Sequence, residues 1–454
     1  MPDVLLVILA VIFVLGIAIN IHEFGHFLVA KLFGMRVEAY SFFGLGPRIW
    51  GFKVGHTDYR VSAIPLGAYV KLYGDEATAP LEGGDSSDEK VPDSELYELR
   101  PRWQKFLVML GGPFMNVMLA LAIPFVGALM YGVPSMPAPI VGVVRPGGAA
   151  EAAGVKVGDR IVAFDGKENP TWGNIRDDSM IAPDKELPIT VERGGQKLSL
   201  AVTPKREDVG GNSIGDVGMV PDAGVEPVEV DRIVEGGPAA QSGLQPGDRV
   251  LAFNGATVRN GQELMSQIPE NRDAPAKFLI ERSGEKKEVT IQAKPDEQGV
   301  YKVGVYFKSS VITTLEPVGA AGALSYAAES NLRILRLTGK VFGQLFTGQR
   351  SVKDAGLSGP VGIVSLIAQI VREAGFAGLV SVLAVISLNL GVFNLLPIPL
   401  LDGGQIMVLG IEKVMSWFGR TLSMAWKERI QLTGLAVILL LIVFVTFLDI
   451  SRFF

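Results

Sequence analysis

The sequence predicts an α-helical membrane protein with four transmembrane helices, a membrane-associated β-hairpin region and two tandem α+β domains. Three observations lead to this fold class: four long apolar runs, a stretch rich in β-forming residues after the first run, and a duplicated unit in the middle of the chain. The composition agrees, because 48% of the 454 residues are hydrophobic and only 20% are charged, which is too apolar for a disordered chain. The formal net charge of −5 argues against a strongly basic nucleic-acid-binding protein.

Each apolar run is long enough to cross a bilayer as a helix. The runs cover residues 4–33, 106–133, 374–401 and 430–448, and the last three contain no Asp, Glu, Lys or Arg. A helix needs about 20 apolar residues to span the hydrocarbon core. The alternative, four buried helices of a large soluble protein, fits uncharged runs of this length poorly. The first run is long and follows no basic residues, so we do not expect it to be a cleaved signal peptide.

Residues 38–73 contain many β-branched and aromatic residues between glycines, which predicts short strands that lie on the membrane or dip into it. A strand edge beside a catalytic site could hold an unwound substrate in extended form. The alternative is a surface hairpin that only packs against the helices. Together with the first two apolar runs, these strands form a predicted segment at 1–133.

Basic residues are concentrated in the two loops that follow the first and third apolar runs. The first loop contains Arg36, Arg48, Lys53, Arg60, Lys71, Arg100, Arg102 and Lys105, and the second contains Lys413, Arg420, Lys427 and Arg429. Loops rich in Lys and Arg stay on the cytoplasmic side of a membrane. We therefore expect a multi-pass membrane protein with residues 134–373 and both termini on the far side of the membrane. In a bacterium with two membranes, this would be an inner-membrane protein with those parts in the periplasm.

The middle region contains a duplicated unit, because residues 147–166 recur at 236–255 with a constant offset of 89 residues. Each copy predicts a small Ala-rich helix, a Gly-Asp turn, an apolar strand and an Asp-Gly or Asn-Gly hairpin turn. Two domains of mixed strand and helix follow, at 134–221 and 222–310. After them, residues 311–373 alternate apolar positions with basic residues, which predicts interfacial amphipathic helices, and residues 374–454 hold the last two apolar runs.

The Gly-Asp-Arg-hydrophobic pattern of each copy resembles the PDZ domain, in the permuted form found in bacterial envelope proteases. PDZ domains bind peptides by adding a strand to a sheet edge. The resemblance implies peptide grooves at two edges, formed by Gly218, Met219 and Val220 in the first copy and by Val303, Gly304 and Val305 in the second. The alternative is that these domains only block access sterically.

The strongest local signal for chemistry is the run His22-Glu23-Phe24-Gly25-His26 inside the first apolar segment. Two histidines four residues apart project from one face of a helix, which suits two imidazole ligands of one zinc ion. The glutamate between them can act as general base on a water at the metal. Ionisable groups within a membrane span are costly and usually functional. The alternative is that these side chains lie at the cytoplasmic helix end and reach water.

A catalytic zinc usually has three protein ligands and one open position. Cysteine is absent, and His56 lies in a hydrophilic Gly-His-Thr-Asp turn where we expect it to be solvated. The third ligand should therefore be a carboxylate, and Asp402, at the end of the third apolar run, is the best candidate. Two prolines before it interrupt helical hydrogen bonding, and irregular backbone at membrane depth is tolerated where it lines a cavity. Other divalent metals could also fit two imidazoles and a carboxylate.

Two amides near the same end, Asn394 and Asn389, are candidates for contact with substrate, and Asn389 could equally serve helix packing. Both histidines and Asp402 lie toward the cytoplasmic end of their segments, so one metal ion could join them.

These motifs together resemble the site-2 protease family of intramembrane zinc metalloproteases, peptidase family M50. The matching runs are His22-Glu23-Phe24-Gly25-His26, Asn394-x-x-Pro397-x-Pro399-x-x-Asp402-Gly403-Gly404, Gly44-x-Gly46-Pro47, Gly112-Pro113-Phe114-Met115-Asn116 and the segment 358–362. The resemblance implies that His22, His26 and Asp402 bind Zn²⁺, that Glu23 is the catalytic base and that Asn394 binds substrate. Two PDZ domains between the second and third spans are typical of the branch that acts in the sigma-E envelope stress response of Gram-negative bacteria.

The sequence thus predicts an intramembrane zinc endopeptidase that cuts single-span membrane proteins. The resemblance implies a membrane-anchored anti-sigma factor, already trimmed by another protease, or remnant signal peptides as substrates, with the PDZ domains acting as a filter. One alternative is a non-catalytic PDZ-bearing receptor for envelope peptides, which would not need the complete metal-binding set. Another is a zinc transporter, which should carry ionisable groups in the second and fourth apolar runs, where there are none.

Overall fold

The computed structural model describes residues 2–64, 67–74, 91–135, 137–209, 212–222, 224, 227–234, 236–295, 301–308, 315–351, 359–420 and 422–451. The chain divides into two compact units. The membrane unit comprises Met1–Val133, Pro317–Arg336 and Leu357–Phe454, and the repeat unit comprises Pro134–Glu316 and Leu337–Gly356. Each unit is described by itself below.

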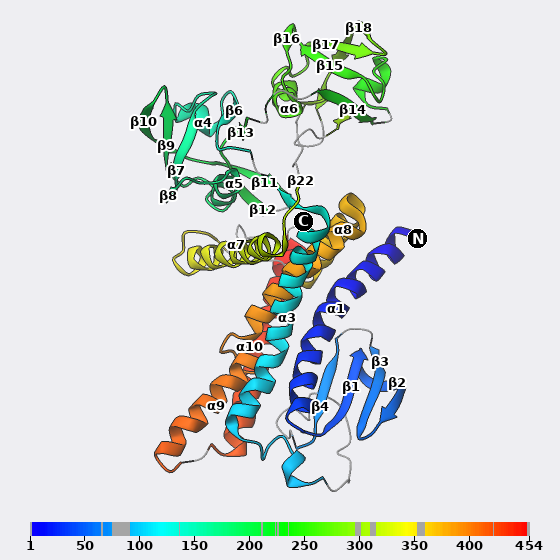
Figure 1. Ribbon diagram of the computed structural model, residues 1–454, viewed down its shortest axis with the longest axis vertical. Coiled ribbons are helices and arrows are strands. Elements are labelled where there is room, and N and C mark those ends of the chain that lie inside the picture. Colours follow the sequence, from blue (N-terminus) through cyan, green and yellow to red (C-terminus); the bar gives the residue numbers. More distant parts are fainter. Residues whose placement is uncertain are drawn as a thin grey trace. The chain divides into compact units, whose positions relative to one another are not determined.

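The membrane unit contains four helices long and apolar enough to span a membrane, which confirms the predicted number for the described residues. These helices are α1 (Pro2–Leu32), α3 (Arg102–Tyr131), α8 (Pro360–Asn394) and α10 (Met424–Ser451). Helices α1, α3 and α8 pack against one another, and α10 packs against α8 (Figure 1). Small and branched apolar side chains fill the space between α1 and α8, with Val14, Ala18 and Ile367 fully buried.

The third span, Ala374–Asn394, begins where the apolar run at 374–401 predicts and ends seven residues earlier. Helix α8 also includes a shorter apolar helix before the span, Pro360–Arg372, and its backbone is interrupted at Gly375, which has φ 58° and ψ −146°. It ends at Asn394, and a short helix, α9 (Asp402–Trp417), follows where we expected a loop. Residues 395–401 are not helical because Pro397 and Pro399 have no N–H to donate to a preceding turn.

A four-stranded sheet follows α1, formed by β1 (Val37–Phe43), β2 (Leu45–Val54), β3 (Thr57–Ile64) and β4 (Tyr69–Leu72). Its strand order is β2-β3-β1-β4, with β1 and β3 parallel and the other neighbours antiparallel. The sheet is thus more than the predicted hairpin. Its two edges differ, since every residue of β4 is buried and packs near α1, while most of β2 is exposed (Figure 1). A short helix, η1 (Asp93–Glu95), lies between β4 and α3.

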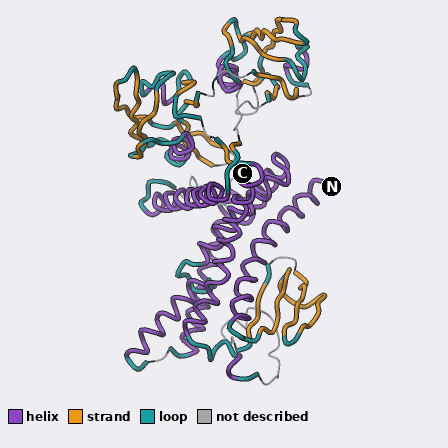
Figure 2. The backbone as a smooth tube through the Cα atoms, viewed as in Figure 1, coloured by secondary structure: helices purple, strands orange, loops and turns teal. Residues whose placement is uncertain are grey.

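The repeat unit contains two domains of similar design, which we call repeat domain 1 and repeat domain 2. Figure 2 shows strands gathered around short helices in each. Repeat domain 1 contains β6 (Val141–Val144), α4 (Ala149–Ala152), β7 (Arg160–Phe164), β8 (Lys167–Glu168), α5 (Trp172–Met180), β9 (Leu187–Arg193), β10 (Gln196–Val202), β11 (Lys205–Val209), β12 (Asn212–Asp216) and β13 (Met219–Pro221). Its core packs around Phe164, Ile175 and Ile189.

Repeat domain 2 repeats this order with a core around Phe253, Leu264 and Phe278, which stand 89 residues after their counterparts. It contains β14 (Val228–Ile233), η2 (Pro238–Gln241), β15 (Arg249–Phe253), β16 (Ala256–Thr257), α6 (Gly261–Glu270), β17 (Pro275–Arg282), β18 (Glu285–Gln292), β19 (Lys294–Pro295), β20 (Tyr301–Lys302) and β21 (Val305–Phe307). The short strands β5 (Val133–Pro134) and β22 (Leu315–Glu316) pair with each other.

The region expected as an interfacial linker contains a 27-residue helix, α7 (Ala320–Phe346). Its first part belongs to the membrane unit, where the Asn331 amide donates to the carbonyl of Ala120 on α3. Its last part belongs to the repeat unit, where Lys340 contacts Asp165 and Asp178 of repeat domain 1.

Candidate metal centre

A close crossing of α1 and α3 brings the two motif histidines against the neighbouring helix. A Cβ at Gly25 would lie 2.1 Å from the carbonyl oxygen of Gly111, so the two backbones are in direct contact. The next residue on α3, Gly112, faces the imidazoles, and a Cβ there would lie 2.4 Å from His26 Nε2 and 2.8 Å from His22 Nε2. Only glycine leaves this room, which explains small residues at a close helix crossing.

The side chains of His22, His26 and Asp402 converge on one point. The two Nε2 atoms are 3.2 Å apart, and the Asp402 carboxylate lies 3.1 Å from His22 Nε2 through Oδ2 and 3.4 Å from His26 Nε2 through Oδ1. One ligand atom from each residue falls within 4.8 Å of the others, and both histidines are buried. The geometry therefore brings together the three ligands that the sequence suggests.

The hydrogen bonds at His26 leave its Nε2 free to bind a metal. His26 Nδ1 lies 2.7 Å from the carbonyl oxygen of Val108. Because a carbonyl only accepts, Nδ1 carries the proton and donates, and Nε2 presents its lone pair to the centre. Asp402 Oδ2 is buried and has no hydrogen-bond donor. A carboxylate oxygen without a donor, facing imidazole nitrogens, is the arrangement that a bound zinc ion would satisfy.

The side-chain amide of Asn116 is placed to support His22 as the Val108 carbonyl supports His26. Asn116 of α3 is completely buried, and its side-chain amide lies 3.3 Å from His22 Nδ1, with Oδ1 lacking a partner. The oxygen and nitrogen of an Asn amide differ little in shape, so a rotation by 180° places Oδ1 against Nδ1. In that orientation Nδ1–H donates to Asn116 and Nε2 faces the metal. The sequence does contain one signal that could have indicated a role for Asn116. Its amide lies inside an uncharged membrane span, where polar groups are usually functional.

The turn that carries Asp402 is strained and tightly packed. Leu400 has φ 86°, a left-handed conformation that is costly for a residue with a side chain and occurs mainly at functional sites. Gly403 and Gly404 let the turn fold back on α9, since a Cβ at these positions would lie 2.2 Å from Leu395 O and 2.1 Å from Ile398 O. The Asp-Gly-Gly sequence is therefore needed to place Asp402 at the first turn of α9.

Glu23 lines a cavity of about 490 Å³ together with the three candidate ligands. Val70 and Leu72 of β4 and Asn394 of α8 line the same cavity. Because Val70 and Leu72 line this cavity together with Glu23, the edge of β4 lies beside the candidate base. Asn394 Nδ2 is 3.2 Å from His22 Nε2, which places this amide at the centre as the sequence suggested.

Two residues considered from the sequence lie elsewhere. Asn389 donates its amide to the carbonyl of Val385 within α8 and does not line the cavity that holds Glu23. His56 lies in the turn between β2 and β3, apart from the group of three ligands.

The predicted peptide grooves lie along strands paired on one side. Met219 and Val220 of β13 pair with β6, and Val305 of β21 pairs with β14. Gly218 and Gly304 precede these strands and accept backbone hydrogen bonds from Arg145 and Val234, and Val303 O accepts from Ala239 N. Within the described strands, β21 lies at the edge of its sheet.

The chain is similar to proteins of known class over most of its length. The family model described as Peptidase family M50 matches residues 10–441. Protease RseP of Yersinia pestis is 31% identical over 100% of both chains. Regulator of sigma-E protease RseP of Escherichia coli (strain K12) is 30% identical over 96% of this chain and 97% of its own. A Vibrio cholerae protein described as a zinc metalloprotease is 30% identical over 91% of this chain and 92% of its own.

Among solved structures, the PDZ domain of the SdrC-like protein from Listeria monocytogenes aligns with 18% of this chain and 85% of its own, with 21% sequence identity and a TM-score of 0.17.

Proposed function

The chain belongs to peptidase family M50 and is a zinc metalloprotease, and from this premise we propose that His22, His26 and Asp402 hold its zinc ion. Glu23 acts as the general base in this proposal. The observation that carries it is the convergence of the three ligand atoms within 4.8 Å of one another, on the wall of the cavity that Glu23 also lines. The enzyme would then cleave peptide bonds within a membrane, since two of the ligands belong to a membrane-spanning helix.

The polar groups at the candidate centre take separate tasks in this reaction. A bound zinc ion would polarise the scissile carbonyl and lower the pKa of water to about 7. Glu23 takes a proton from the attacking water and returns it to the leaving amine, as general bases in hydrolysis do. The Asn394 amide, 3.2 Å from His22 Nε2, can donate to a carbonyl oxygen of the substrate. Asn116 and Val108 O hold the two imidazoles in the tautomer that presents Nε2.

The edge of β4 offers a place for the substrate backbone. Ala68, Val70 and Leu72 line the cavity, and among the described strands β4 is an edge strand that pairs with β1. The carbonyls of a helical substrate are occupied by the helix's own hydrogen bonds, so cleavage requires an extended segment. Adding the segment as a strand to β4 would supply backbone hydrogen bonds and present one peptide bond to Glu23.

Single-span membrane proteins are the substrate class that this site suits. Relatives of about 30% identity are named regulators of sigma-E protease, which favours a membrane-anchored anti-sigma factor that another protease has shortened. Remnant signal peptides belong to the same chemical class. The basic loops favour an inner-membrane orientation with the repeat unit and both termini in the periplasm and the metal centre toward the cytoplasm. The repeat domains would exclude bulky substrates, or bind peptides along β13 and β21.

The test is cleavage of a tagged single-span substrate by the purified chain in detergent, with bound metal quantified. The wild type is compared with Glu23→Gln, which keeps the ligands, and with Asp402→Ala, which removes one. We expect the wild type to cut and to hold about one zinc per chain, Glu23→Gln to hold zinc without cutting, and Asp402→Ala to lose both. The proposal would be contradicted if the wild type held no zinc or if Glu23→Gln still cut the substrate. A wild type without zinc would favour a non-catalytic receptor.

A further inference from the structure

Helix α10 touches the rest of the membrane unit at few points. Among the α10 residues whose side chains the structure describes, only Gly434 and Asp449 are buried. Most of the other apolar side chains, such as Leu440 and Val443, are exposed, as expected for a helix surrounded by lipid. Of the two buried positions, Gly434 is the one that adjoins the turn before Asp402.

Gly434 contacts the turn that carries Asp402. A Cβ at Gly434 would lie 2.3 Å from Pro399 O and 2.5 Å from Pro399 Cβ, so α10 meets the backbone of this turn directly. A Cβ at Gly404 would likewise lie 2.7 Å from Pro399 Cα. Pro399 thus contacts both a glycine of α9 and a glycine of α10, three residues before the candidate ligand.

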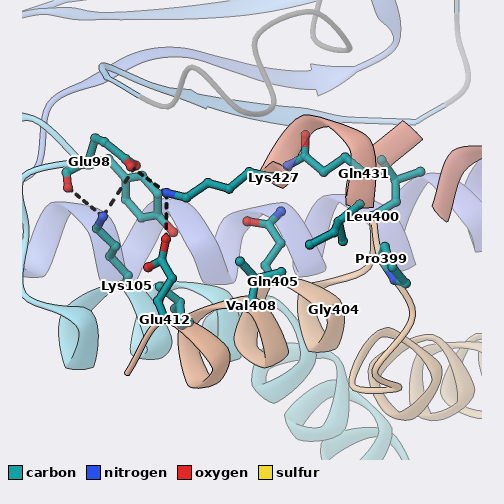
Figure 3. A pocket seen from close by; sticks show the side chains of 13 residues that line it. Glu98, Lys105, Pro399, Leu400, Gly404, Gln405, Val408, Glu412, Lys427 and Gln431 are labelled. Atoms are coloured by element: carbon teal, nitrogen blue, oxygen red, sulfur yellow. Dashed lines mark hydrogen bonds and ion pairs between the residues drawn. The ribbon is translucent and has the colours of Figure 1, made fainter. Parts of the chain in front are cut away.

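The two ends of α10 are attached by polar contacts. Near its start, Lys427 pairs with Glu412 of α9 at 2.8 Å and with Glu98 at 3.2 Å, in the ion-pair cluster drawn in Figure 3. Near its end, Asp449 accepts hydrogen bonds from the backbone N–H groups of Gly359 and Gly362, at 3.1 Å and 2.8 Å. These N–H groups belong to the first turn of α8 and have no partner within that helix. These contacts at both ends of α10 fix the position of Gly434 along the helix axis relative to Pro399.

We propose that Gly434 is a positioning residue for the metal ligand Asp402 and acts through Pro399. The inference rests on the proposed function, in which Asp402 is the third ligand. The strained Leu400 lies between Pro399 and Asp402, and a strained conformation persists only where its surroundings hold it. Contact from both α9 and α10 supplies that support. Figure 3 shows Pro399 and Leu400 beside Gly404 and Gln405 of α9.

A purely structural role for Gly434 is the competing explanation, because small residues often allow membrane helices to pack closely. The two explanations differ in what a single added methyl group should do. A packing role lowers the stability of the whole unit, whether or not metal is bound. If Gly434 positions the ligand, the added methyl group displaces Asp402 and changes metal binding, even when the metal-free protein is as stable as the wild type.

The experiment compares Gly434→Ala with Gly127→Ala in the purified full-length chain. Gly127 also lies in a membrane-spanning helix, and a Cβ there meets nothing within 4 Å. Because both substitutions replace a helical glycine by alanine, they raise helix propensity by the same amount. They differ in that the new methyl group clashes with Pro399 in Gly434→Ala only. The readouts are zinc affinity by competition with a chromophoric chelator, the absorption spectrum of the Co²⁺-loaded protein, and the Tm of the metal-free protein.

For Gly434→Ala we expect a loss of zinc affinity of about tenfold, the effect typical of residues that orient metal ligands. The Co²⁺ spectrum should change, and the Tm without metal should stay near that of the wild type. Gly127→Ala should match the wild type in all three readouts. Wild-type zinc affinity and an unchanged Co²⁺ spectrum in Gly434→Ala would overturn the proposal. A wild type without zinc would instead overturn the proposed function.

A second pair of variants covers the case in which Gly434→Ala does not fold. Lys427→Met releases the start of α10 without adding bulk near Pro399, and exposed Lys413 of α9 provides the control Lys413→Met. We expect the Co²⁺ spectrum to change for Lys427→Met and not for the control. Identical spectra in both variants and the wild type would again overturn the proposal.

Discussion

Repeat domains 1 and 2 each contain the same arginine–aspartate ion pair, with the same donor and acceptor atoms at similar distances. In repeat domain 1, Arg193 binds Asp159 with both oxygens at 2.7 Å and also donates to Gly154 O at 2.8 Å. In repeat domain 2, Arg282 binds Asp248 at 2.6 Å and 2.7 Å and donates to Gly243 O at 2.8 Å. All three positions are offset by 89 residues. The carboxylates are buried, so the duplicated motif preserves a fully paired charge that would be costly if unpaired.

The two domains differ in their contacts with α7. Lys340 pairs with Asp165 at 3.3 Å and with Asp178 at 2.7 Å, both in repeat domain 1. The equivalent residues of repeat domain 2 are the amides Asn254 and Gln267, which carry no charge to attract a lysine. The β11–β12 hairpin of repeat domain 1 adds a further contact, because its Ser213 carbonyl accepts a hydrogen bond from Arg350. The shared ion pair thus maintains the fold, whereas the acidic pair gives one copy a specific helix contact.

The largest expected effect comes from removing a core phenylalanine in either domain. Phe164→Ala and Phe253→Ala each leave a cavity in a buried core and should cost about 3–5 kcal/mol of the free energy of unfolding of that domain. Because α7 contacts repeat domain 1, only Phe164→Ala should also raise amide hydrogen exchange at residues 337–350. Hydrogen-exchange mass spectrometry on the intact chain measures both effects. Equal exchange at 337–350 in the two variants would show that the helix contact is not specific.

Acid should affect both domains alike through the shared ion pair. Burial by itself would raise the pKa of Asp159 and Asp248, but the arginine hydrogen bonds and backbone N–H groups hold each pKa below its usual value. The stabilisation is therefore complete above the unfolded-state pKa of about 3.9 and is lost as the pH falls through the lower pKa of the folded state. Hydrogen exchange followed below pH 4 should show parallel loss of protection in both domains. Arg193→Met should weaken this pH dependence in repeat domain 1 alone.

The helix caps offer a finer distinction between the copies. Thr171 caps α5 by accepting from Asn174 N, and its counterpart Asn260 accepts from Glu263 N ahead of α6. The Asn260 side chain also donates to Gly224 O, so it makes one more hydrogen bond than the Thr171 side chain. Thr171→Ala should cost about 0.5–1 kcal/mol, and Asn260→Ala about 1–2 kcal/mol. Denaturant unfolding resolved by domain-specific hydrogen exchange checks the order, and the reverse order would contradict the count of bonds.

The smallest expected effect comes from giving repeat domain 1 the amides of repeat domain 2. The double variant Asp165→Asn/Asp178→Gln removes the carboxylates that pair with partly exposed Lys340. Since exposed ion pairs contribute little, the loss should be about 0.5–1 kcal/mol in the docking of residues 337–350. Increased exchange there, with an unchanged core of repeat domain 1, is the expected result. Protection equal to the wild type would assign the docking to the hydrogen bonds that the Gln344 and Arg350 side chains donate to backbone carbonyls of repeat domain 1.

The metal centre illustrates what a sequence can predict from local chemistry. The spacing of His22 and His26 determines a shared helix face, because 3.6 residues complete a turn. With three histidines and no cysteine, a carboxylate was the expected third ligand, and Asp402 could be proposed because it ends a long uncharged run. Asn116 could not be assigned a role in this way, because its contact with His22 joins residues 94 positions apart on different helices.

The sequence by itself determined the four apolar spans, the duplication and the candidate metal-binding residues, because these follow from periodicity, length and residue chemistry along the chain. Only the tertiary structure decided that α8 extends before the third span to Pro360 with a break at Gly375, that the β4 edge lies beside Glu23, and that α10 meets the Asp402 turn at Gly434. Those features depend on which backbones approach closely enough for a glycine to be required. Such pairings between distant segments leave no periodic signal in a single sequence.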